Sequence, residues 1–367
     1  MFNFRKKNFR KLDLPLLAVV FLLCLYGLVV LYSASLSLET NIIRSQIIST
    51  VLGFIMIGFL LFVDMDFLRE LYVPIYAISL GLMLAVTLFG RGYEEWGANN
   101  WLVLGPIQFQ PSEFVKIGLI LSLAGYLDQH GKTINHPFNL LKVLVMAGFP
   151  IALILREDLG TAAATSFMVG VMLFSAGIAY RYVFGVIGIG LAVTPVLYAS
   201  LSAFQKNRIL DFLDPMRDPT GTGFQSLQGR IAIGSGQLVG RGLFEGVQTQ
   251  NNFIPEKQTD YIFAVLSEEL GFLGSALLIL LYGLMLYRLI VIARESKDLY
   301  CSLVVCGVAG MLLIHIFENI GMSVGIMPVT GIPLPFLSHG GTFQLINLIA
   351  IGLALSVSIE RKPLDFS

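Results

Sequence analysis

Charged residues are scarce in this chain, and their scarcity excludes an ordinary soluble fold. Only 13% of the 367 residues are charged, whereas a soluble domain has about 25%. The net charge is +0, and no basic stripe with interleaved aromatic residues is present, so nucleic acid is not an expected partner. Hydrophobic residues make up 56% of the chain. They recur in runs of about 20 residues, the length that spans a bilayer core of about 30 Å.

Cysteine and histidine are also rare, which removes several classes of site. The three cysteines, Cys24, Cys301 and Cys306, lie within apolar runs, and an odd number in lipid argues against a disulfide framework. The four histidines show no metal-ligand spacing, and no Ser-His-Asp arrangement is visible. The glycine-rich run from Gly234 to Gly242 lacks the preceding strand and the lysine of a phosphate-binding loop.

The apolar runs predict an all-α, polytopic membrane protein that forms one domain over residues 1–367. A basic segment, Met1–Lys11, precedes the first run, which is too long for the apolar part of a signal peptide. We expect about ten transmembrane helices. They are predicted at Leu14–Ala34, Gln46–Val63, Leu71–Phe89, Ser112–Leu127, Leu141–Leu155, Gly160–Ile178, Val183–Leu201, Tyr261–Ile290, Leu299–Met322 and Gly341–Ser358.

The distribution of Lys and Arg predicts that both termini are cytoplasmic. Basic residues are concentrated at the two ends and in alternate connections, while the short loops on the other side hold few. Two long segments, about 90–111 and 202–258, are then extracytoplasmic, the second between helices 7 and 8. A loop of that length is usually functional or disordered. Its apolar patches and glycines predict that it folds back on the membrane surface.

Asp260 is the most informative candidate, because it stands where the long polar segment enters the eighth span. An ionisable residue at membrane depth costs roughly 2.5–3.5 kcal/mol and is a functional candidate by default. An acidic residue in a first helical turn is the structural alternative. On a continuous helix, Asp260 would share a face with Ala264, Ser267, Glu268 and Gly271. That face is small and polar, so it is predicted to look into a cavity or a neighbouring helix.

Glu113 and Lys116 follow Pro111 at the start of the fourth span. They can simply pair at i,i+3 on an ordinary helix start. Alternatively, they form a polar pair at the extracytoplasmic mouth that faces the same cavity as Asp260.

Other polar residues have equally plain alternatives. Asp158 can cap a helix. Arg208 can belong to a solvated loop, or it can receive an anionic headgroup, since guanidinium suits phosphate oxygens. Trp101 can be an interfacial aromatic or a sugar platform. The glycines and prolines from Gly331 to Gly341, around Ser338, predict re-entrant or broken-helix backbone that is buried in protein or lines a cavity.

Several motifs, in order along the chain, resemble the SEDS family (shape, elongation, division and sporulation). They are Phe109–Glu113, Asp158–Thr161, Ile231–Gly236, Pro255–Glu256, Thr259–Gly271 and Gly331–Pro335. The details before Glu256 and around Asn319 are more similar to the RodA branch than to the FtsW branch. The resemblance departs at Asn100, where the family usually has a basic residue, and at Glu157, Gln258 and His339.

The resemblance implies a peptidoglycan glycosyltransferase that polymerises lipid II at the outer face of the bacterial cytoplasmic membrane, for cell elongation and shape. It also implies a class B penicillin-binding protein, a transpeptidase, as partner. Asp260 matches the family's catalytic aspartate, and Glu113 and Lys116 match its polar pair in the fourth helix. Residues expected to support catalysis or bind substrate are Glu113, Lys116, Asp158, Arg208, Glu256, Ser338 and Trp101.

The expected chemistry needs one base and a means of stabilising a leaving pyrophosphate. Asp260 would remove the proton of the attacking sugar hydroxyl. Arg208, Lys116 or a divalent cation would stabilise the pyrophosphate charge. Mg²⁺ or Mn²⁺ held partly by Asp260 or Glu113 is one hypothesis. A lipid II flippase is the alternative function, since polar cavities and broken helices also suit transporters, and a scaffold for the transpeptidase is a third.

Overall fold

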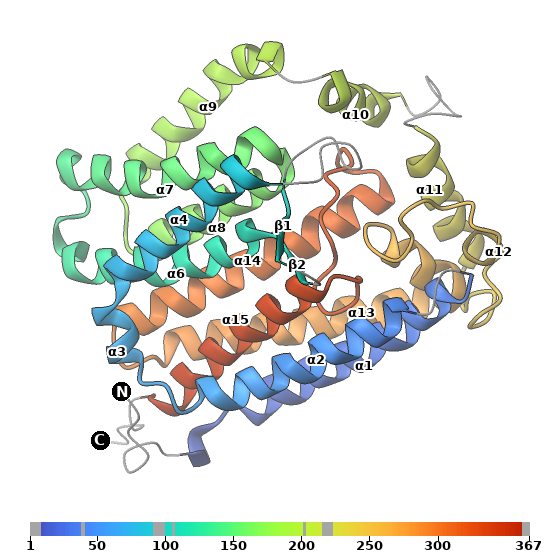
Figure 1. The fold of residues 1–367 in the computed structure, drawn as a ribbon, viewed down its shortest axis with the longest axis horizontal. Helices are drawn as coiled ribbons and strands as arrows, with labels where there is room; N and C mark the ends of the chain where they lie inside the picture. Colours follow the sequence, from blue (N-terminus) through green and yellow to red (C-terminus); the bar gives the residue numbers. More distant parts are fainter. Residues whose placement is uncertain are drawn as a thin grey trace.

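The computed structural model describes residues 9–37, 41–90, 100–104, 107–200, 203–214 and 223–361, and these are mostly helical (Figure 1). The α-helices that coincide with the ten predicted spans are α1 (Leu14–Ser35), α2 (Asn41–Leu60), α4 (Tyr72–Phe89), α6 (Pro111–His130), α7 (Pro137–Glu157), α8 (Leu159–Ser175), α9 (Tyr180–Ser200), α13 (Ile262–Arg294), α14 (Leu299–Val324) and α15 (Gly341–Ile359). Shorter α-helices are α3 (Met65–Glu70), α10 (Ala203–Leu213), α11 (Phe224–Gly236) and α12 (Val247–Gln250).

Seven of these helices are long and apolar enough to cross a membrane: α1, α2, α4, α7, α13, α14 and α15. The helix α6 carries Glu113, Lys116 and Asp128 within 20 residues, which makes it unusually polar for a span. The apolar helix α8 has only 17 residues. The chain is therefore a multi-pass membrane protein, and the full count of ten spans remains a prediction.

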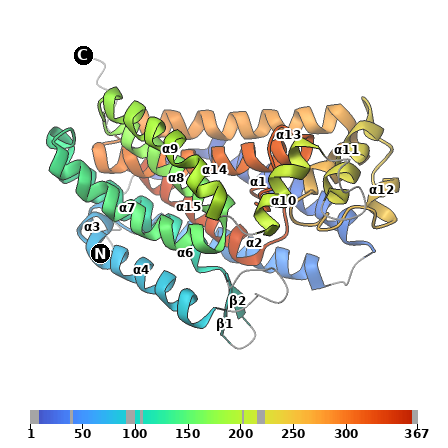
Figure 2. The same ribbon diagram turned by 90° about the horizontal axis from the view of Figure 1, so that it is seen from above.

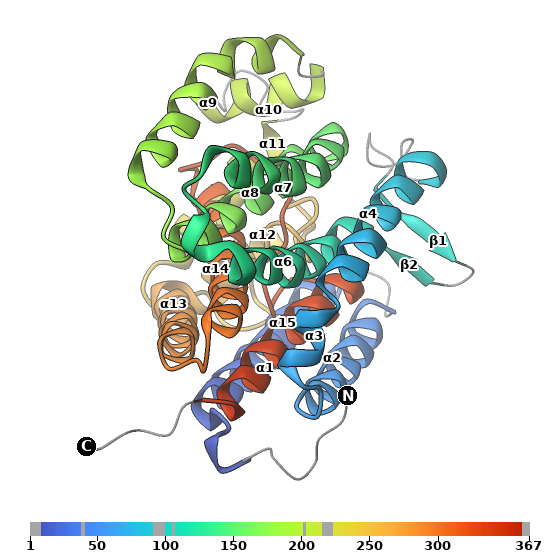
Figure 3. The same cartoon turned by 90° about the vertical axis from the view of Figure 1, so that its left-hand side faces the viewer.

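The first long loop contains a small β-hairpin that the all-α prediction did not include. Strands β1 (Leu102–Leu104) and β2 (Ile107–Phe109) pair antiparallel, with Val103 opposite Gln108. Figures 2 and 3 show the hairpin at the edge of the bundle, beside the end of α4. The hairpin leads directly into α6, which begins with Pro111 at a position where its missing N–H has no cost.

Helix α14 forms the centre of the bundle. It packs against α6, α8, α13 and α15 (Figures 1 and 3), and its buried side chains occur on most of its faces. A helix that is apolar all round is typical of the interior of a membrane bundle. By contrast, α9 and α10 lie along one edge, apart from the central helices (Figure 3).

The eighth predicted span is not one continuous helix, because it breaks at Gly271. This residue has φ 64° and ψ −160°, a conformation that glycine adopts without steric cost. A Cβ atom here would lie 2.3 Å from the backbone nitrogen of Gly240. The break therefore depends on glycine twice, once for the backbone angles and once for the close approach of a second segment.

The second long loop binds to the backbone groups that this break leaves free. The N–H of Phe272 donates to the carbonyl of Gln237 at 2.8 Å, and the carbonyl of Glu268 accepts from the N–H of Arg241 at 3.0 Å. Unpaired backbone groups at membrane depth cost several kcal/mol each, so the loop satisfies what the kink exposes. The described part of this loop packs on the broken helix, and its predicted return to the membrane surface stays a prediction.

A buried carboxylate joins the two ends of the described chain. Asp13 caps α1 and accepts hydrogen bonds from Arg288 at 2.5 Å and from Arg361 at 2.6 Å. Burial raises the pKa of Asp13, but these bonds outweigh it and the net pKa lies below the ordinary value. The start of α1, the end of α13 and the residues after α15 are thereby held together.

Candidate active site

Asp260 lies in a tight turn that precedes α13. The carbonyl of Glu256 accepts from the backbone N–H groups of Thr259, Asp260 and Tyr261 at 3.1 to 3.3 Å. Glu256 itself has φ 50°, and its side chain accepts from the Thr259 hydroxyl at 3.1 Å. The turn thus fixes the backbone of Asp260 from the side of the long loop.

The prediction that Asp260 shares a helix face with Ser267 and Glu268 is wrong. The helix starts only at Ile262, so Asp260 does not follow its periodicity. The Glu268 carboxylate instead accepts from the N–H groups of Gln248 and Thr249 at 2.8 and 3.0 Å, within the long loop. The polar face predicted from sequence therefore holds the loop and not the Asp260 side chain.

A second segment, residues 331–340, fixes the same turn from the opposite side. Ser338 donates its hydroxyl to the carbonyl of Thr259 and accepts from the N–H of Leu334. Asn319 of α14 donates to the carbonyls of Asp260 at 2.9 Å and Ile332 at 2.8 Å. Residues 326–340 are not helical and include buried Leu334 and Ser338, which confirms the prediction of a broken, protein-buried backbone here.

Asn319 is a site residue that the sequence reasoning missed as a functional candidate. It sits within an apolar span, where an amide is costly unless it is hydrogen-bonded. That cost is a signal that could have identified it.

The electrostatic environment of Asp260 favours a protonated carboxyl group at low pH. Desolvation is the largest cause, and the neighbouring carboxylates of Glu256 and Asp158 add to it, while Arg208 opposes it. Together they raise the pKa of Asp260 to about 7. A carboxylate with a pKa near the working pH is suited to general base catalysis.

Arg208 of α10 lies beside Asp260, and its predicted role in binding an anionic headgroup stays a prediction. Its guanidinium donates to the carbonyl of Thr330 at 3.3 Å. A Cβ on Gly331, which has φ 75°, would lie 3.5 Å from Asp260 Oδ2 and 3.6 Å from Arg208 Nη1. Both charged groups therefore lie against the same stretch of glycine backbone.

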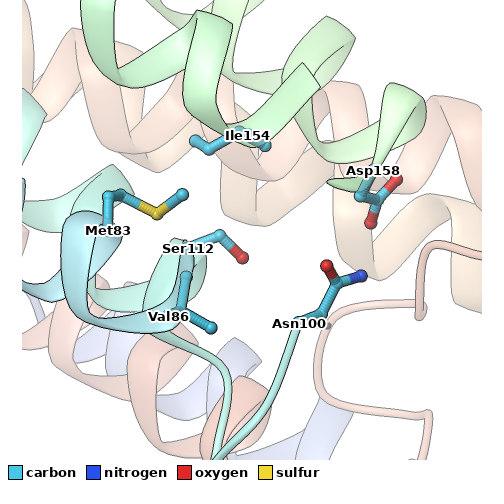
Figure 4. A pocket seen from close by; sticks show the side chains of 6 residues that line it. All are labelled: Met83, Val86, Asn100, Ser112, Ile154 and Asp158. Carbon is cyan, nitrogen blue, oxygen red and sulfur yellow. The ribbon is translucent and has the colours of Figure 1, made fainter. Parts of the chain in front are cut away.

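Asp158 caps α8 and lines a small cavity beside the hairpin. Its Oδ1 accepts from the Thr161 N–H at 3.1 Å and its Oδ2 from the Thr161 hydroxyl at 2.7 Å, so the predicted cap is confirmed. The cavity, of about 10 Å³, is also lined by Asn100 and Ser112 (Figure 4). It has room for roughly one water molecule. Asn100, the residue before Trp101, faces Asp158 across this cavity (Figure 4).

Trp101 is half-buried at the foot of the hairpin. Neither a sugar-platform role nor an interfacial role follows from its position, and both remain predictions.

Glu113 and Lys116 pair as predicted, at 2.8 Å, but the pair is buried and does not line an open mouth. Lys116 also lies 2.8 Å from Nε2 of His315. Since Nδ1 of His315 is next to the carbonyl of Met311, Nδ1 carries the hydrogen and Nε2 accepts from Lys116. The ammonium group is engaged by protein partners on two sides.

The pair belongs to a larger buried cluster on α6 and α14. Glu318 is buried, and one of its carboxylate oxygens has no hydrogen-bond partner in the part of the chain that the structure describes. His315 was not predicted as a site residue, although a histidine within an apolar span is itself a signal. The cluster lies within the bundle and makes no direct contact with Asp260 that the structure shows.

The residues around Asp260 do not form a metal cage. Within the described ranges, no three His, Cys, Asp or Glu side chains gather in a geometry that could hold a metal ion. Glu113 is engaged with Lys116, so Asp260 and Glu113 do not make a shared site. A divalent cation would need most of its ligands from substrate and water.

Comparisons with known proteins show one consistent set of relatives. A family profile described as "Cell cycle protein", covering FtsW, RodA and SpoVE, matches residues 14–363. Stage V sporulation protein E of Bacillus subtilis is 38% identical over 94% of this chain and 96% of its own length. Peptidoglycan glycosyltransferase MrdB of Escherichia coli K12 is 34% identical over 97% of this chain and 96% of its own.

Solved structures agree in fold. A chain from a structure of a peptidoglycan synthase complex that coordinates polymerization and crosslinking matches with a TM-score of 0.83 and 34% identity, over 95% of this chain and 97% of that chain. The rod shape determining protein RodA of Thermus thermophilus matches with a TM-score of 0.73 and 29% identity, over 98% and 99%. The fold of this chain is therefore the same as that of these two solved proteins.

Proposed function

The chain belongs to the FtsW, RodA and SpoVE family, the SEDS family that its motifs resemble, and on that premise we propose that it is a peptidoglycan glycosyltransferase. It polymerises lipid II into glycan strands. The observation that supports this most directly is Asp260, a carboxylate fixed by its backbone from two sides and held at a pKa of about 7 beside Arg208.

Asp260 acts as the base for the attacking sugar hydroxyl. A hydroxyl is a poor nucleophile until its proton is removed, and a positioned base contributes about 10²–10⁴-fold to the rate. Asp260 is partly exposed, so a substrate can reach it. The oxygen of the acceptor sugar bonds to the anomeric carbon of the donor, the bond to pyrophosphate breaks, and the proton passes to Asp260.

Arg208 stabilises the charge that develops on the leaving pyrophosphate. Its guanidinium lies against Gly331 next to Asp260, and guanidinium groups match phosphate oxygens in geometry. Lys116 has a different role, because it is buried and bound to Glu113 and His315. It links α6 to α14 through its contact with His315.

A divalent cation remains a proposal of its own. Mg²⁺ is commonly bound by one or two carboxylates together with substrate phosphates and water, and Asp260 is the protein ligand available for such an arrangement. No step above depends on it.

The protein acts at the outer face of the cytoplasmic membrane, with both termini inside, and serves cell elongation and shape. The positions of Lys and Arg support this orientation. A class B penicillin-binding protein is its partner, since the related chain above comes from a complex that couples polymerization to crosslinking.

The test is polymerisation of fluorescent lipid II by purified protein in liposomes, with the transpeptidase and Mn²⁺ each present and absent. Wild type should make glycan strands, and Asp260→Ala should make none while retaining its elution volume and thermal stability. Full activity of Asp260→Asn would refute the role of the base.

A lipid II flippase is the competing function, and the buried charges of Glu113, Lys116 and Glu318 are what favour it. The same liposomes decide between the two. Strand synthesis supports the polymerase, whereas transbilayer movement of lipid II without strands, in folded protein with its partner, supports the flippase.

A further inference from the structure

Arg230 is a second guanidinium near the site, and no charge partner for it lies among the residues that the structure describes. It lies on α11, in the long loop that binds the break in α13. No hydrogen bond or ion pair joins it to any other residue in the described ranges, and its Nε is buried with no partner. A buried donor of this kind costs free energy unless something satisfies it.

The position of Arg230 is fixed by the outer end of α14. Gly325, the residue after that helix, has φ 81°. A Cβ there would lie 2.4 Å from the guanidinium carbon of Arg230. The guanidinium therefore lies directly against backbone that only glycine can provide. The negative end of the α14 dipole attracts the charge, but this attraction leaves the Nε without an acceptor.

Arg230 lies close to Tyr261, the residue next to Asp260. Arg230 and Arg208 both lie within electrostatic reach of the Tyr261 hydroxyl. The Tyr261 ring also packs against Gly229, the neighbour of Arg230 on α11. The hydroxyl of Tyr261 is buried, and Ser226 of α11 is its polar neighbour. The buried Nε of Arg230, which has no acceptor among the described residues, thus lies near the turn that carries the base.

The segment from Gly325 to Gly331 connects the two arginines. Arg230 lies against its first residue, and Arg208 lies against its last, next to Asp260. A single guanidinium binds one phosphate group through two parallel hydrogen bonds. Two guanidiniums along one backbone segment therefore fit a ligand with two linked phosphates better than one with a single phosphate.

We propose that Arg230, together with Arg208, binds the diphosphate of the lipid-linked sugar donor, with Arg230 on the phosphate farther from Asp260. This rests on the proposed function, since only a donor of that chemistry brings a diphosphate to the outer face. Lys116, expected from sequence to share this role, is thereby replaced by a residue of the long loop.

The experiment measures binding of geranylgeranyl diphosphate and geranylgeranyl monophosphate to purified full-length protein in detergent, by microscale thermophoresis. Wild type should prefer the diphosphate. Arg230→Gln should weaken diphosphate binding on the order of tenfold, equivalent to about 1.4 kcal/mol, and abolish the preference over monophosphate. Arg241→Gln is the matched control, because Arg241 is an exposed arginine of the same loop. It should change either affinity less than about twofold.

Unchanged diphosphate binding in Arg230→Gln, or an equal loss for both ligands, would overturn the assignment. If Arg230→Gln does not fold, Arg230→Lys keeps the charge but loses the two parallel hydrogen bonds. It should then bind diphosphate more weakly than Arg241→Lys does, and equal affinities would count against the proposal. The ligands are not polymerised, so a wild type that binds diphosphate but makes no glycan would refute the proposed function alone.

Discussion

Asn319 holds Asp260 by the main chain: its amide nitrogen donates to the Asp260 carbonyl at 2.9 Å. The same nitrogen donates to the carbonyl of Ile332 at 2.8 Å. A residue of the central helix therefore ties the turn that carries the base to the segment that covers it. The tie uses the backbone carbonyl of Asp260 and not its carboxylate, so it limits the movement of the turn without occupying the group proposed as the base.

Replacing Asn319 should reduce catalysis without removing any group that touches the reacting atoms. Asn319→Leu leaves two buried carbonyls without a donor, which costs about 1–3 kcal/mol of stability. We expect the lipid II polymerisation rate to fall on the order of tenfold or more, because a small displacement of a catalytic group is costly.

The matched control is Asn251→Leu, since Asn251 is exposed and its side-chain amide donates to the carbonyl of Val247 in α12. It should leave the rate unchanged. A rate for Asn319→Leu equal to that of the control, in folded protein, would show that the tie is not needed.

The rate of polymerisation should depend on pH through Asp260. A base must be ionised, so the raised pKa of about 7 predicts activity that falls roughly tenfold per pH unit below 7 and levels off above it. Asp158→Asn removes a neighbouring negative charge, while asparagine still caps a helix. The midpoint of the profile should then move to lower pH.

Arg208→Gln removes the opposing positive charge and should move the midpoint to higher pH. Initial rates between pH 5 and 9, with lipid II saturating, provide the measurement. A profile that is flat below pH 7 in the wild type would contradict the environment described for Asp260.

Removing one member of the Glu113–Lys116 pair should destabilise the protein more than removing both. Lys116→Met leaves the Glu113 carboxylate buried and unpaired, and breaking a buried pair in this way costs roughly 3–5 kcal/mol. The double variant Glu113→Gln/Lys116→Met removes both charges and should recover much of the loss. Thermal unfolding in detergent, followed by elution of intact protein, measures both.

Lys142→Met is the control for the loss of a lysine, because Lys142 is exposed on α7 and lies over the ring of Phe138. It should be close to neutral. If the double variant were less stable than Lys116→Met, the buried charge would not be the cause of the destabilisation.

Gly271→Ala should destabilise the protein, because alanine neither tolerates φ 64° nor leaves room for the backbone of Gly240. Gly283→Ala lies in the same helix, where a Cβ meets nothing within 4 Å. That substitution should be neutral or stabilising by about 0.5–1 kcal/mol. Melting temperatures of the two variants under identical conditions test the pair, and equal values would show that the break is not specific to glycine.

The long helices were predictable because each one coincides with a run of apolar residues in its own segment of the sequence. The predicted span Leu299–Met322 and the observed α14, Leu299–Val324, differ by two residues at one end. The break at Gly271 was not predictable in this way. It exists because Gly240, distant in the chain, approaches that point, and no local pattern contains this contact. The unusual length of the predicted span, Tyr261–Ile290, was the one local feature of the sequence that indicated the break.

The site was predictable in its residue types more than in its arrangement. Asp260 was found because a carboxylate at the entry of an apolar span is costly. Its relation to Arg208 depends on how the loop returns to Gly331, which one sequence does not contain. The burial of Lys116 depends on His315 of another helix. From the sequence, Arg208 and Lys116 were equal candidates for the cation at the pyrophosphate, and only tertiary packing distinguishes them.

The ion pairs of Asp13 connect the beginning of the described chain to its end. The first span begins and the last span ends at one buried carboxylate, which Arg361 and Arg288 share. If either terminal helix leaves the bundle, Asp13 and Arg361 lose each other as ion-pair partners. The two ends of the described chain are therefore expected to unfold together. A membrane protease that pulls on one terminus would therefore have to break the contacts of both terminal helices.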